Sequence, residues 1–229
     1  MKDVHREGIR NLKEEKQGFS LEEEEQMWQK GVLGSSTAKI LTDTIYFYNG
    51  KIFGLRTGEH RMIRPRDFEI GDDYIQYTEN ASKTHQGGLR DLKKNPRVIK
   101  HFCEMCSNGE EHTRCLVRIY RQYLELVECL RTKDSAYYFQ AYTDKFELKN
   151  IPMGIHTLNK IVPSLCERAC LQRRTSHCLR VTCASRLFNA NEKEELIRGR
   201  TGHTSEALFR YEKANRQQEL QVSNLLGPP

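Results

Sequence analysis

The chain has 229 residues, with 37 Lys and Arg against 31 Asp and Glu, and a formal net charge of +6. Hydrophobic residues make up 37% and aromatic residues 9%, which is enough for a sizeable core and excludes a disordered chain, although the mean hydropathy is −0.74. No apolar run reaches the roughly 20 residues of a membrane-spanning helix, and the first 16 residues lack the apolar stretch of a secretory signal. We therefore expect neither a membrane protein nor a secreted protein.

The charge is unevenly distributed along the chain. The first 30 residues carry six basic and eight acidic side chains, so the remainder carries a net charge of +8. A positive balance of this size is compatible with a polyanionic partner such as nucleic acid. It is equally compatible with a solvated Lys and Arg surface, so charge alone does not decide between the two.

Two helices are predicted near the start of the chain. Ser20 and Glu23 have the spacing of a capping box, and the apolar residues after them predict a helix over about 21–32. A second helix is predicted over about 37–48. Asn49-Gly50 is a strong turn signal, and we expect it to end that helix.

Residues 64–88 have the features of a small antiparallel hairpin. Arg64-Pro65 disfavours helix, and polar and apolar residues alternate over 68–77 around the turn signal Gly71-Asp72. Lys83 is then expected just beyond the hairpin or on a third strand.

The rest of the chain shows mostly helical periodicity. Helices are predicted over about 114–131, 156–171, 176–188, 192–199, 204–211 and 212–225. The predicted fold class is therefore α+β, a mainly helical domain with a small antiparallel sheet.

The segment over residues 176–213 carries reactive side chains at informative spacing. His177 and Arg180 are three positions apart in a predicted helix and therefore share a face. His203 lies in a loop after the next helix, and Tyr211 follows it by eight positions. Upstream, Arg56 is predicted just after the second helix.

Together with Lys83 of the hairpin, these residues form a coherent set for metal-free phosphodiester transesterification. Arginine forks hold a phosphate bidentately and stabilise the extra charge of the transition state. A tyrosine hydroxyl can attack phosphorus while histidine assists proton removal. A lysine can protonate the leaving 5′ oxygen.

Five motifs carry a resemblance to a known family. They are YFYNGKIFGLR with EHR beyond it, SKTHQGG, RCLVRIYRQY, SHCLR and RTGHTSEALFRYEK. In these motifs and their order the sequence resembles the tyrosine recombinase superfamily. More narrowly, it resembles the eukaryotic branch found in crypton transposons and in the derived C-terminal domains of MYM-type zinc-finger and glutamine-rich proteins. The resemblance covers about residues 20–215 and implies the fold of a recombinase catalytic domain.

The resemblance also implies a function and a role for each matching residue. It implies double-stranded DNA as partner, cleavage and rejoining of DNA strands through a 3′-phosphotyrosine intermediate, no metal and no cofactor. The implied roles are Arg56 and Arg180 as phosphate clamps, Lys83 as general acid, His177 as proton acceptor, His203 as hydrogen-bond partner of the scissile phosphate, and Tyr211 as nucleophile.

Two departures from the family pattern favour an alternative function. The spacing from His203 to Tyr211 is one residue shorter than usual, and one residue on a helix corresponds to about 100° of rotation. Complete recombinases also have an N-terminal helical domain that closes around DNA, and only about 20 residues precede the first predicted helix here. The alternative is a catalytically inactive, crypton-derived DNA- or protein-binding module of a chromatin or transcription factor.

The predicted domain boundaries and cellular context follow from the same resemblance. We expect a charged leader or linker over 1–19, the catalytic-like domain over 20–225 and a tail over 226–229. Recombinases of this type assemble on DNA, which implies a homo-oligomer, and the implied localisation is nuclear. Arg173 and Arg174 are candidates for contact with the DNA backbone or for a weak nuclear signal, with a solvated pair as the alternative.

The eight cysteines raise a second hypothesis, because a non-secreted chain uses cysteines as thiols or metal ligands. Five possible metal ligands lie close together in one segment of the sequence: His101, Cys103, Cys106, His112 and Cys115. Cys103 and Cys106 have the spacing of a zinc knuckle. Against a zinc site, Cys115 is expected to open a helix and pack into the core. Cys178 and Cys183 are expected to be small buried residues on the helix of His177.

Overall fold

A computed structural model describes residues 17–79, 96–101, 108, 112–203 and 208–209. The elements in chain order are α1 (Leu21–Gln29), α2 (Ala38–Ile52), α3 (Thr57–Met62), η1 (Pro65–Asp67), β1 (Phe68–Ile70), β2 (Tyr74–Tyr77), β3 (Arg97–Lys100), α5 (Leu116–Glu128), η2 (Lys133–Ser135), β4 (Phe139–Ala141), β5 (Leu148–Pro152), α6 (Ile155–Ala169), α7 (His177–Asn189) and α8 (Glu194–Thr201). The fold class predicted from the sequence is confirmed in these elements.

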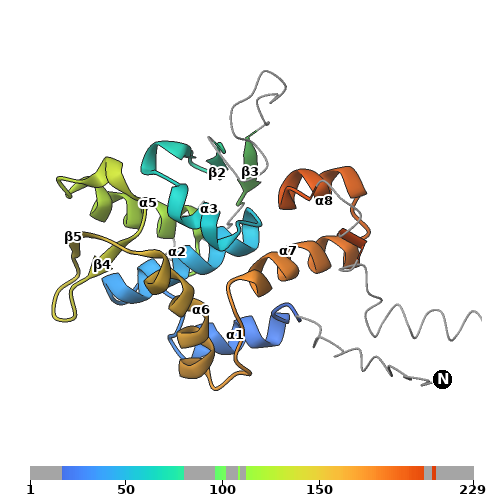
Figure 1. The fold of residues 1–229 in the computed structure, drawn as a ribbon, viewed down its shortest axis with the longest axis horizontal. Helices are drawn as coiled ribbons and strands as arrows, with labels where there is room; N and C mark the ends of the chain where they lie inside the picture. Colours follow the sequence, from blue (N-terminus) through green and yellow to red (C-terminus); the bar gives the residue numbers. More distant parts are fainter. Residues whose placement is uncertain (1–16, 80–95, 102–107, 109–111, 204–207, 210–229) are drawn as a thin grey trace, which may run out of the picture.

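Helix α2 lies at the centre of the domain (Figure 1). Leu41, Ile45, Tyr46 and Phe47 are fully buried there, and the helix packs against α5, α6, α7 and β4. A helix that is buried on nearly all sides is stabilised by its neighbours rather than by an amphipathic stripe. The positions of the surrounding helices are therefore set by the side chains of α2.

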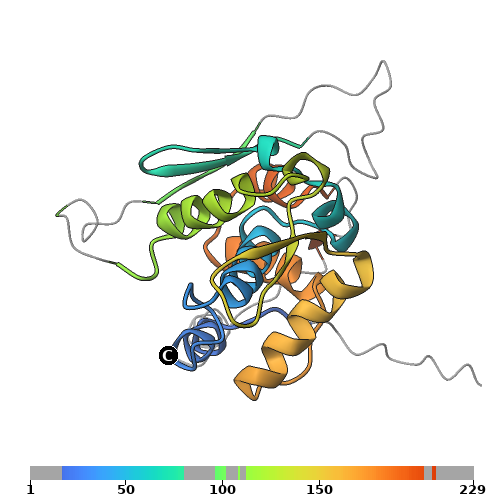
Figure 2. The ribbon, with the colours of Figure 1, turned by 90° about the vertical axis from the view of Figure 1, so that its left-hand side faces the viewer.

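Two small antiparallel sheets flank this helical core in the described part of the chain. β1, β2 and β3 form one sheet in that order, with Ile70 opposite Ile75, and α5 packs against β1 and β2 (Figure 2). β4 and β5 form a separate hairpin with an irregular register. The predicted hairpin over 68–77 is thus confirmed, whereas the β4–β5 hairpin was not predicted.

The predicted helices that fall on described residues are present, with ends shifted by a few positions. The capping box of Ser20 and Glu23 opens α1, as predicted. Phe19 is also part of the core, because it is 3% exposed and its N–H donates to Thr182 Oγ1 at 2.7 Å. Of the helix predicted over 204–211 only Leu208 and Phe209 are described, and the helix predicted over 212–225 lies outside the described residues.

The expected end of the second helix at Asn49-Gly50 is wrong, because α2 continues to Ile52. The Asn49 side chain is fully buried, where its amide donates to Tyr138 Oη and its oxygen accepts from Tyr120 Oη. Gly50 is required for helix packing rather than for a turn. A Cβ at this position would lie 2.5 Å from Leu179 Cδ1 of α7.

None of the helices within the described residues is long and apolar enough to cross a membrane.

Alanine normally stabilises a helix relative to glycine, but the close approach at Gly50 predicts that alanine destabilises the protein at this position. Gly50→Ala is expected to lower the free energy of unfolding by about 1–3 kcal/mol, because the new methyl group overpacks the contact with Leu179. Gly199→Ala in α8 is the matched control, since a Cβ there meets nothing within 4 Å. That variant is expected to gain about 0.5–1 kcal/mol from helix propensity. Chemical denaturation measures both, and equal effects of the same sign would contradict the packing argument.

Candidate active site

Four of the six predicted site residues are brought together by three segments of the fold. Arg56 is the N-cap of α3, His177 and Arg180 lie in the first turn of α7, and His203 follows α8. Arg180 contacts His203 directly, and the charges of Arg56, His177 and Arg180 all act on the His203 ring. Residues up to 147 positions apart in the sequence therefore form one cationic cluster.

Arg180 is the most deeply placed member of the cluster, with 2% exposure. Its Nη1 donates to the carbonyl oxygen of Gly54 at 2.9 Å, and its Nε donates to His203 Nε2 at 3.4 Å. Gly54 has a φ of +60°, and a Cβ there would lie 3.0 Å from Thr201 Cα. Only glycine fits both the backbone conformation and this approach, so Gly54 allows the end of α2 to meet the end of α8.

Arg56 is held from two sides. Its Nη1 pairs with Glu59 Oε1 at 2.5 Å, and its Nη2 donates to the Gly202 carbonyl at 3.4 Å. The other Glu59 oxygen accepts from the Arg56 backbone N–H at 2.8 Å, which caps α3. Glu59 was not predicted as a site residue, although its position three residues after an N-cap is a recognisable signal.

His203 is neutral in this environment. Burial, followed by the charges of Arg180, Arg56, His177 and Arg198, lowers the pKa of His203 to about 4. Its Nδ1 lies 2.8 Å from Thr201 Oγ1, and Thr201 Oγ1 donates to Ile197 O. Because Nε2 accepts from Arg180, the proton of the neutral ring belongs on Nδ1.

The two remaining predicted catalytic residues, Lys83 and Tyr211, lie outside the described residues. Their roles stay predictions. The buried pair of Glu79 and Arg97 lies at the described ends that precede and follow the segment containing Lys83. Arg97 also donates to the carbonyl oxygen of Phe53, which connects β3 to the residue before Gly54.

The structure describes His101, His112 and Cys115 of the hypothetical zinc site. Cys103 and Cys106 lie outside the described residues, whereas His101 and His112 have ring centroids 6.5 Å apart. Cys115 is buried and precedes α5, as expected for a core residue, and Cys178 and Cys183 are buried on α7. The residues that the structure describes contain no group of three possible metal ligands.

The two arginines before α7 differ in their surroundings. Arg173 is exposed. The Arg174 guanidinium pairs with Glu23 at 2.8 Å and lies 4.8 Å from the centre of the Phe19 ring, so this side chain joins α7 to α1. Of the two side chains, that of Arg173 is therefore the one that faces solvent.

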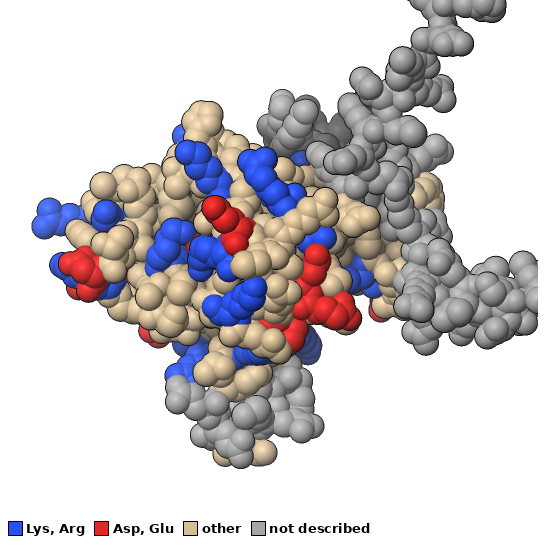
Figure 3. All heavy atoms as spheres, turned by 90° about the horizontal axis from the view of Figure 1, so that it is seen from below, with Lys and Arg blue, Asp and Glu red and all other residues tan. Residues whose placement is uncertain are grey.

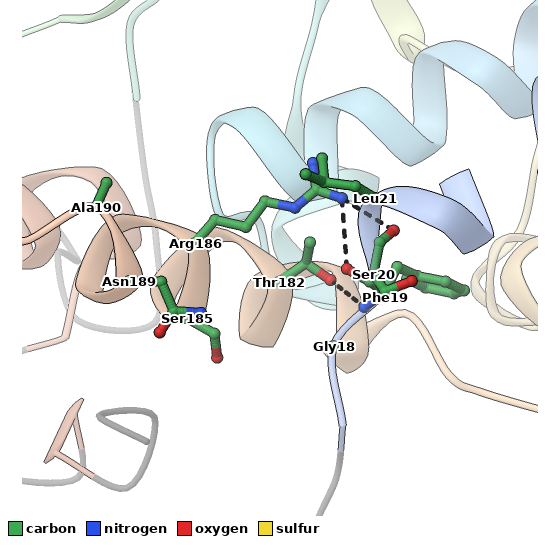
Figure 4. Close-up of a pocket in the computed structure, with 9 residues that line it drawn as sticks. All are labelled: Gly18, Phe19, Ser20, Leu21, Thr182, Ser185, Arg186, Asn189 and Ala190. Atoms are coloured by element: carbon green, nitrogen blue, oxygen red, sulfur yellow. Dashed lines mark hydrogen bonds between the residues drawn. The ribbon is translucent and has the colours of Figure 1, made fainter. Parts of the chain in front are cut away.

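A separate cavity of about 560 Å³ lies between the N-terminal segment and α7 (Figure 4). Four residues of α7 line this cavity: Thr182, Ser185, Arg186 and Asn189. Because each residue of a helix turns by about 100°, these four lie on the side of α7 opposite His177 and Arg180. This cavity is therefore not the candidate active site. Lys and Arg are also intermixed with Asp and Glu on the face in Figure 3, so that face is not a uniformly positive surface.

Comparison with protein families identifies the chain. The model of the family described as "Domain of unknown function (DUF3504)" matches residues 18–167. The chain belongs to this family. The DUF3504 match covers the segment from α1 to α6 and includes Arg56, whereas His177, Arg180 and His203 lie beyond it.

Curated relatives of this DUF3504 chain are much longer proteins. The chain is 26% identical over 167 residues to the uncharacterized protein KIAA1958 of Homo sapiens, a match that covers 67% of this chain and 22% of that protein. It is 30% identical over 135 residues to zinc finger MYM-type protein 3 of Mus musculus, covering 53% and 10%. The chain therefore matches about a fifth or less of the length of these relatives.

Solved structures similar to the DUF3504 chain are recombinases and integrases. The XerH site-specific recombinase in a post-cleavage complex has a TM-score of 0.65 at 15% identity, covering 93% of this chain and 54% of that one. XerA recombinase has a TM-score of 0.61 at 15% identity, covering 93% and 66%. The Tn1549 transposon integrase has a TM-score of 0.57 at 17% identity, covering 96% and 69%. The fold of the DUF3504 chain is thus that of tyrosine recombinase catalytic domains.

The environment of His203 predicts its titration. The ring is expected to titrate near pH 4 rather than 6.5, and Arg56→Gln is expected to raise that pKa because it removes a nearby positive charge. The unfolded chain binds a proton between these pH values that the folded protein does not. The free energy of unfolding should therefore fall as the pH is lowered from about 6.5 towards 4.

NMR of the histidine side chains measures this titration. Arg61→Gln is the matched control, because Arg61 is exposed on the same short helix α3. A His203 pKa at or above 6.5, or the same shift in both variants, would contradict the arrangement of charges described above.

Proposed function

We propose that this chain binds double-stranded DNA and carries an active site of the tyrosine recombinase or integrase type. The observation that carries this proposal is the convergence of Arg56, His177, Arg180 and His203 from three separate segments. Such a cluster of cationic and imidazole groups is suited to an anionic phosphodiester. The sequence motifs point independently to the same four residues.

In the proposed reaction, the Tyr211 hydroxyl attacks the scissile phosphorus and gives up its proton to His177. A bond forms between phosphorus and the tyrosine oxygen, and the bond to the 5′ oxygen breaks. Lys83 protonates that 5′ oxygen, which leaves as a hydroxyl, and a 3′-phosphotyrosine link remains. Arg56 and Arg180 hold the non-bridging oxygens, and rejoining reverses these steps.

The position of His203 adds a condition to this reaction. In the free protein its Nε2 accepts a hydrogen bond from Arg180. To donate to a phosphate oxygen, Nε2 must instead carry a proton, and a bound anion favours that state. Binding of DNA is therefore expected to raise the pKa of His203 above the value of about 4 in the free protein.

The proposal also covers the origin of the chain, its partner, its assembly and its localisation. Origin in the crypton branch is supported by the motifs and by the match to an MYM-type zinc finger protein. DNA as partner is supported by structural neighbours solved in complex with DNA, such as the Tn1549 transposon integrase bound to transposon right end DNA. Assembly as a homo-oligomer on DNA and localisation in the nucleus follow from the same family resemblance.

The second candidate function is a catalytically inactive DNA- or protein-binding module. It is favoured by the spacing of eight positions from His203 to Tyr211, one fewer than is usual in the recombinase family. In that case the cationic cluster retains its affinity for phosphate, and strand cleavage is lost.

A suicide DNA substrate tests the proposed activity. The wild-type chain is expected to form a covalent protein–DNA adduct, and Tyr211→Phe is expected to abolish it because the attacking oxygen is gone. Tyr142→Phe is the matched control, since Tyr142 is an exposed tyrosine on the β4–β5 hairpin and should not matter. Denaturing gel electrophoresis detects the adduct.

Binding measured in parallel separates the two candidates. Salt-sensitive DNA binding without an adduct rejects the enzyme and supports the module. If the chain fails to bind DNA even below about 0.1 M salt, where phosphate contacts are strongest, both DNA-based functions are rejected.

A further inference from the structure

A network of buried polar side chains connects elements that carry the candidate active site. Its members come from α2, α3, α5 and the residue before β4, and each is no more than 2% exposed: Tyr46, Asn49, His60, Tyr120 and Tyr138. Burying a polar group costs free energy unless the group is hydrogen-bonded. The hydrogen bonds of such a network therefore favour one arrangement of its side chains.

The Tyr46 hydroxyl connects two of the segments that carry the site. It donates to Ser176 Oγ at 2.9 Å, and the Thr57 side chain is a second polar neighbour of this hydroxyl. Ser176 directly precedes His177, and Thr57 directly follows Arg56. The Tyr46 hydroxyl is therefore hydrogen-bonded to the residue before α7, and the Tyr46 side chain also contacts α3, where its ring stacks on His60.

The Tyr46 ring is itself held in place by the other members of this network. The His60 ring stacks on it with centroids 4.0 Å apart, and His60 Nδ1 lies 2.8 Å from Tyr138 Oη. Asn49 donates to the same Tyr138 oxygen at 2.8 Å and accepts from Tyr120 Oη at 2.7 Å. These contacts anchor Tyr46 to the most buried part of the domain.

Tyr46 and His60 keep the same protonation states over a wide pH range, so their contacts do not change with pH. Burial raises the pKa of Tyr46 to about 12 and lowers the pKa of His60 to about 3. Tyr46 thus remains a hydrogen-bond donor and His60 remains neutral across the physiological range.

We propose that Tyr46 is a positioning residue of the candidate active site, one that fixes α3, which begins after Arg56, relative to His177 through its contacts with His60 and Ser176. Tyr46 does not contact the phosphate in this proposal, which rests on the proposed function for its catalytic consequence. Small displacements of the groups around a reacting centre lower the reaction rate by large factors. A buried hydroxyl outside the site can therefore affect the rate through the positions of the site residues.

Tyr46→Phe tests the proposal, with Tyr123→Phe as the matched control. Tyr123 is also fully buried, and its hydroxyl donates to the backbone oxygen of Tyr137 at 2.8 Å, away from α3 and α7. Both variants lose one buried hydrogen bond and should lose similar stability, about 1 kcal/mol. Only Tyr46→Phe is expected to slow adduct formation in a single turnover, by about 10- to 100-fold, with DNA affinity retained.

A second readout does not depend on catalysis. The charges of Arg56 and His177 contribute to the low pKa of His203, so a change in their positions should move that pKa towards 6.5. Tyr46→Phe is expected to produce this shift and Tyr123→Phe is not. Ser176→Ala removes the acceptor of the same hydrogen bond, and the double variant should be no worse than either single variant.

The outcomes distinguish failure of this proposal from failure of the proposed function. If wild type forms no adduct but Tyr46→Phe shifts the His203 titration, the proposed activity is wrong and the positioning role stands. If Tyr46→Phe matches Tyr123→Phe in both the His203 titration and the rate of adduct formation, the hydroxyl serves stability alone and the positioning proposal is rejected.

Discussion

The peptide segment of Phe53 and Gly54 is the contact on which the candidate site depends. Its two carbonyl oxygens accept hydrogen bonds from arginines on different elements, Phe53 from Arg97 of β3 and Gly54 from Arg180 of α7. The missing side chain of Gly54 also lets Thr201 of α8 come close, where a Cβ would lie 3.0 Å from Thr201 Cα. A sheet and two helices therefore converge on the turn that immediately precedes Arg56.

The electrostatics of this convergence favour an anionic ligand. Arg97 and Arg180 are 7% and 2% exposed, and burying such cations is costly unless carbonyl dipoles or carboxylates compensate. Phe53 and Gly54 supply the dipoles, and Glu79 supplies a carboxylate to Arg97. Around His203, by contrast, the acting charges are positive, and the ring adapts by losing its proton. An incoming oxyanion would relieve the remaining repulsion, which is a physical reason for the phosphate binding proposed above.

The sequence predicted the parts of this architecture that depend on local patterns. Periodic helices and the hairpin at Gly71 were predicted because their signals lie within a few residues of one another. The end of α2 was predicted wrongly because Asn49 is satisfied by hydroxyl groups of Tyr120 and Tyr138, which are distant in the sequence. Likewise, the positions of Arg56, His177, Arg180 and His203 were assigned from motifs, whereas their distances and the part of Glu59 depend on tertiary contacts.

Helix α7 links the stability of the domain to the geometry of the site, because it packs against both α2 and α8. Leu179 packs against Gly50 of α2, while Arg186 on the outer side donates to the backbone oxygens of Phe19 and Ser20. Overfilling a close-packed contact forces side chains off their rotamers and shifts the backbone nearby. A Cβ at position 50 would lie 2.5 Å from Leu179 Cδ1 of α7 and 3.3 Å from His60 Nε2 of α3, so a larger residue there would disturb both helices that carry the site. Substitutions between α2 and α7 should consequently alter the site without touching any of its residues.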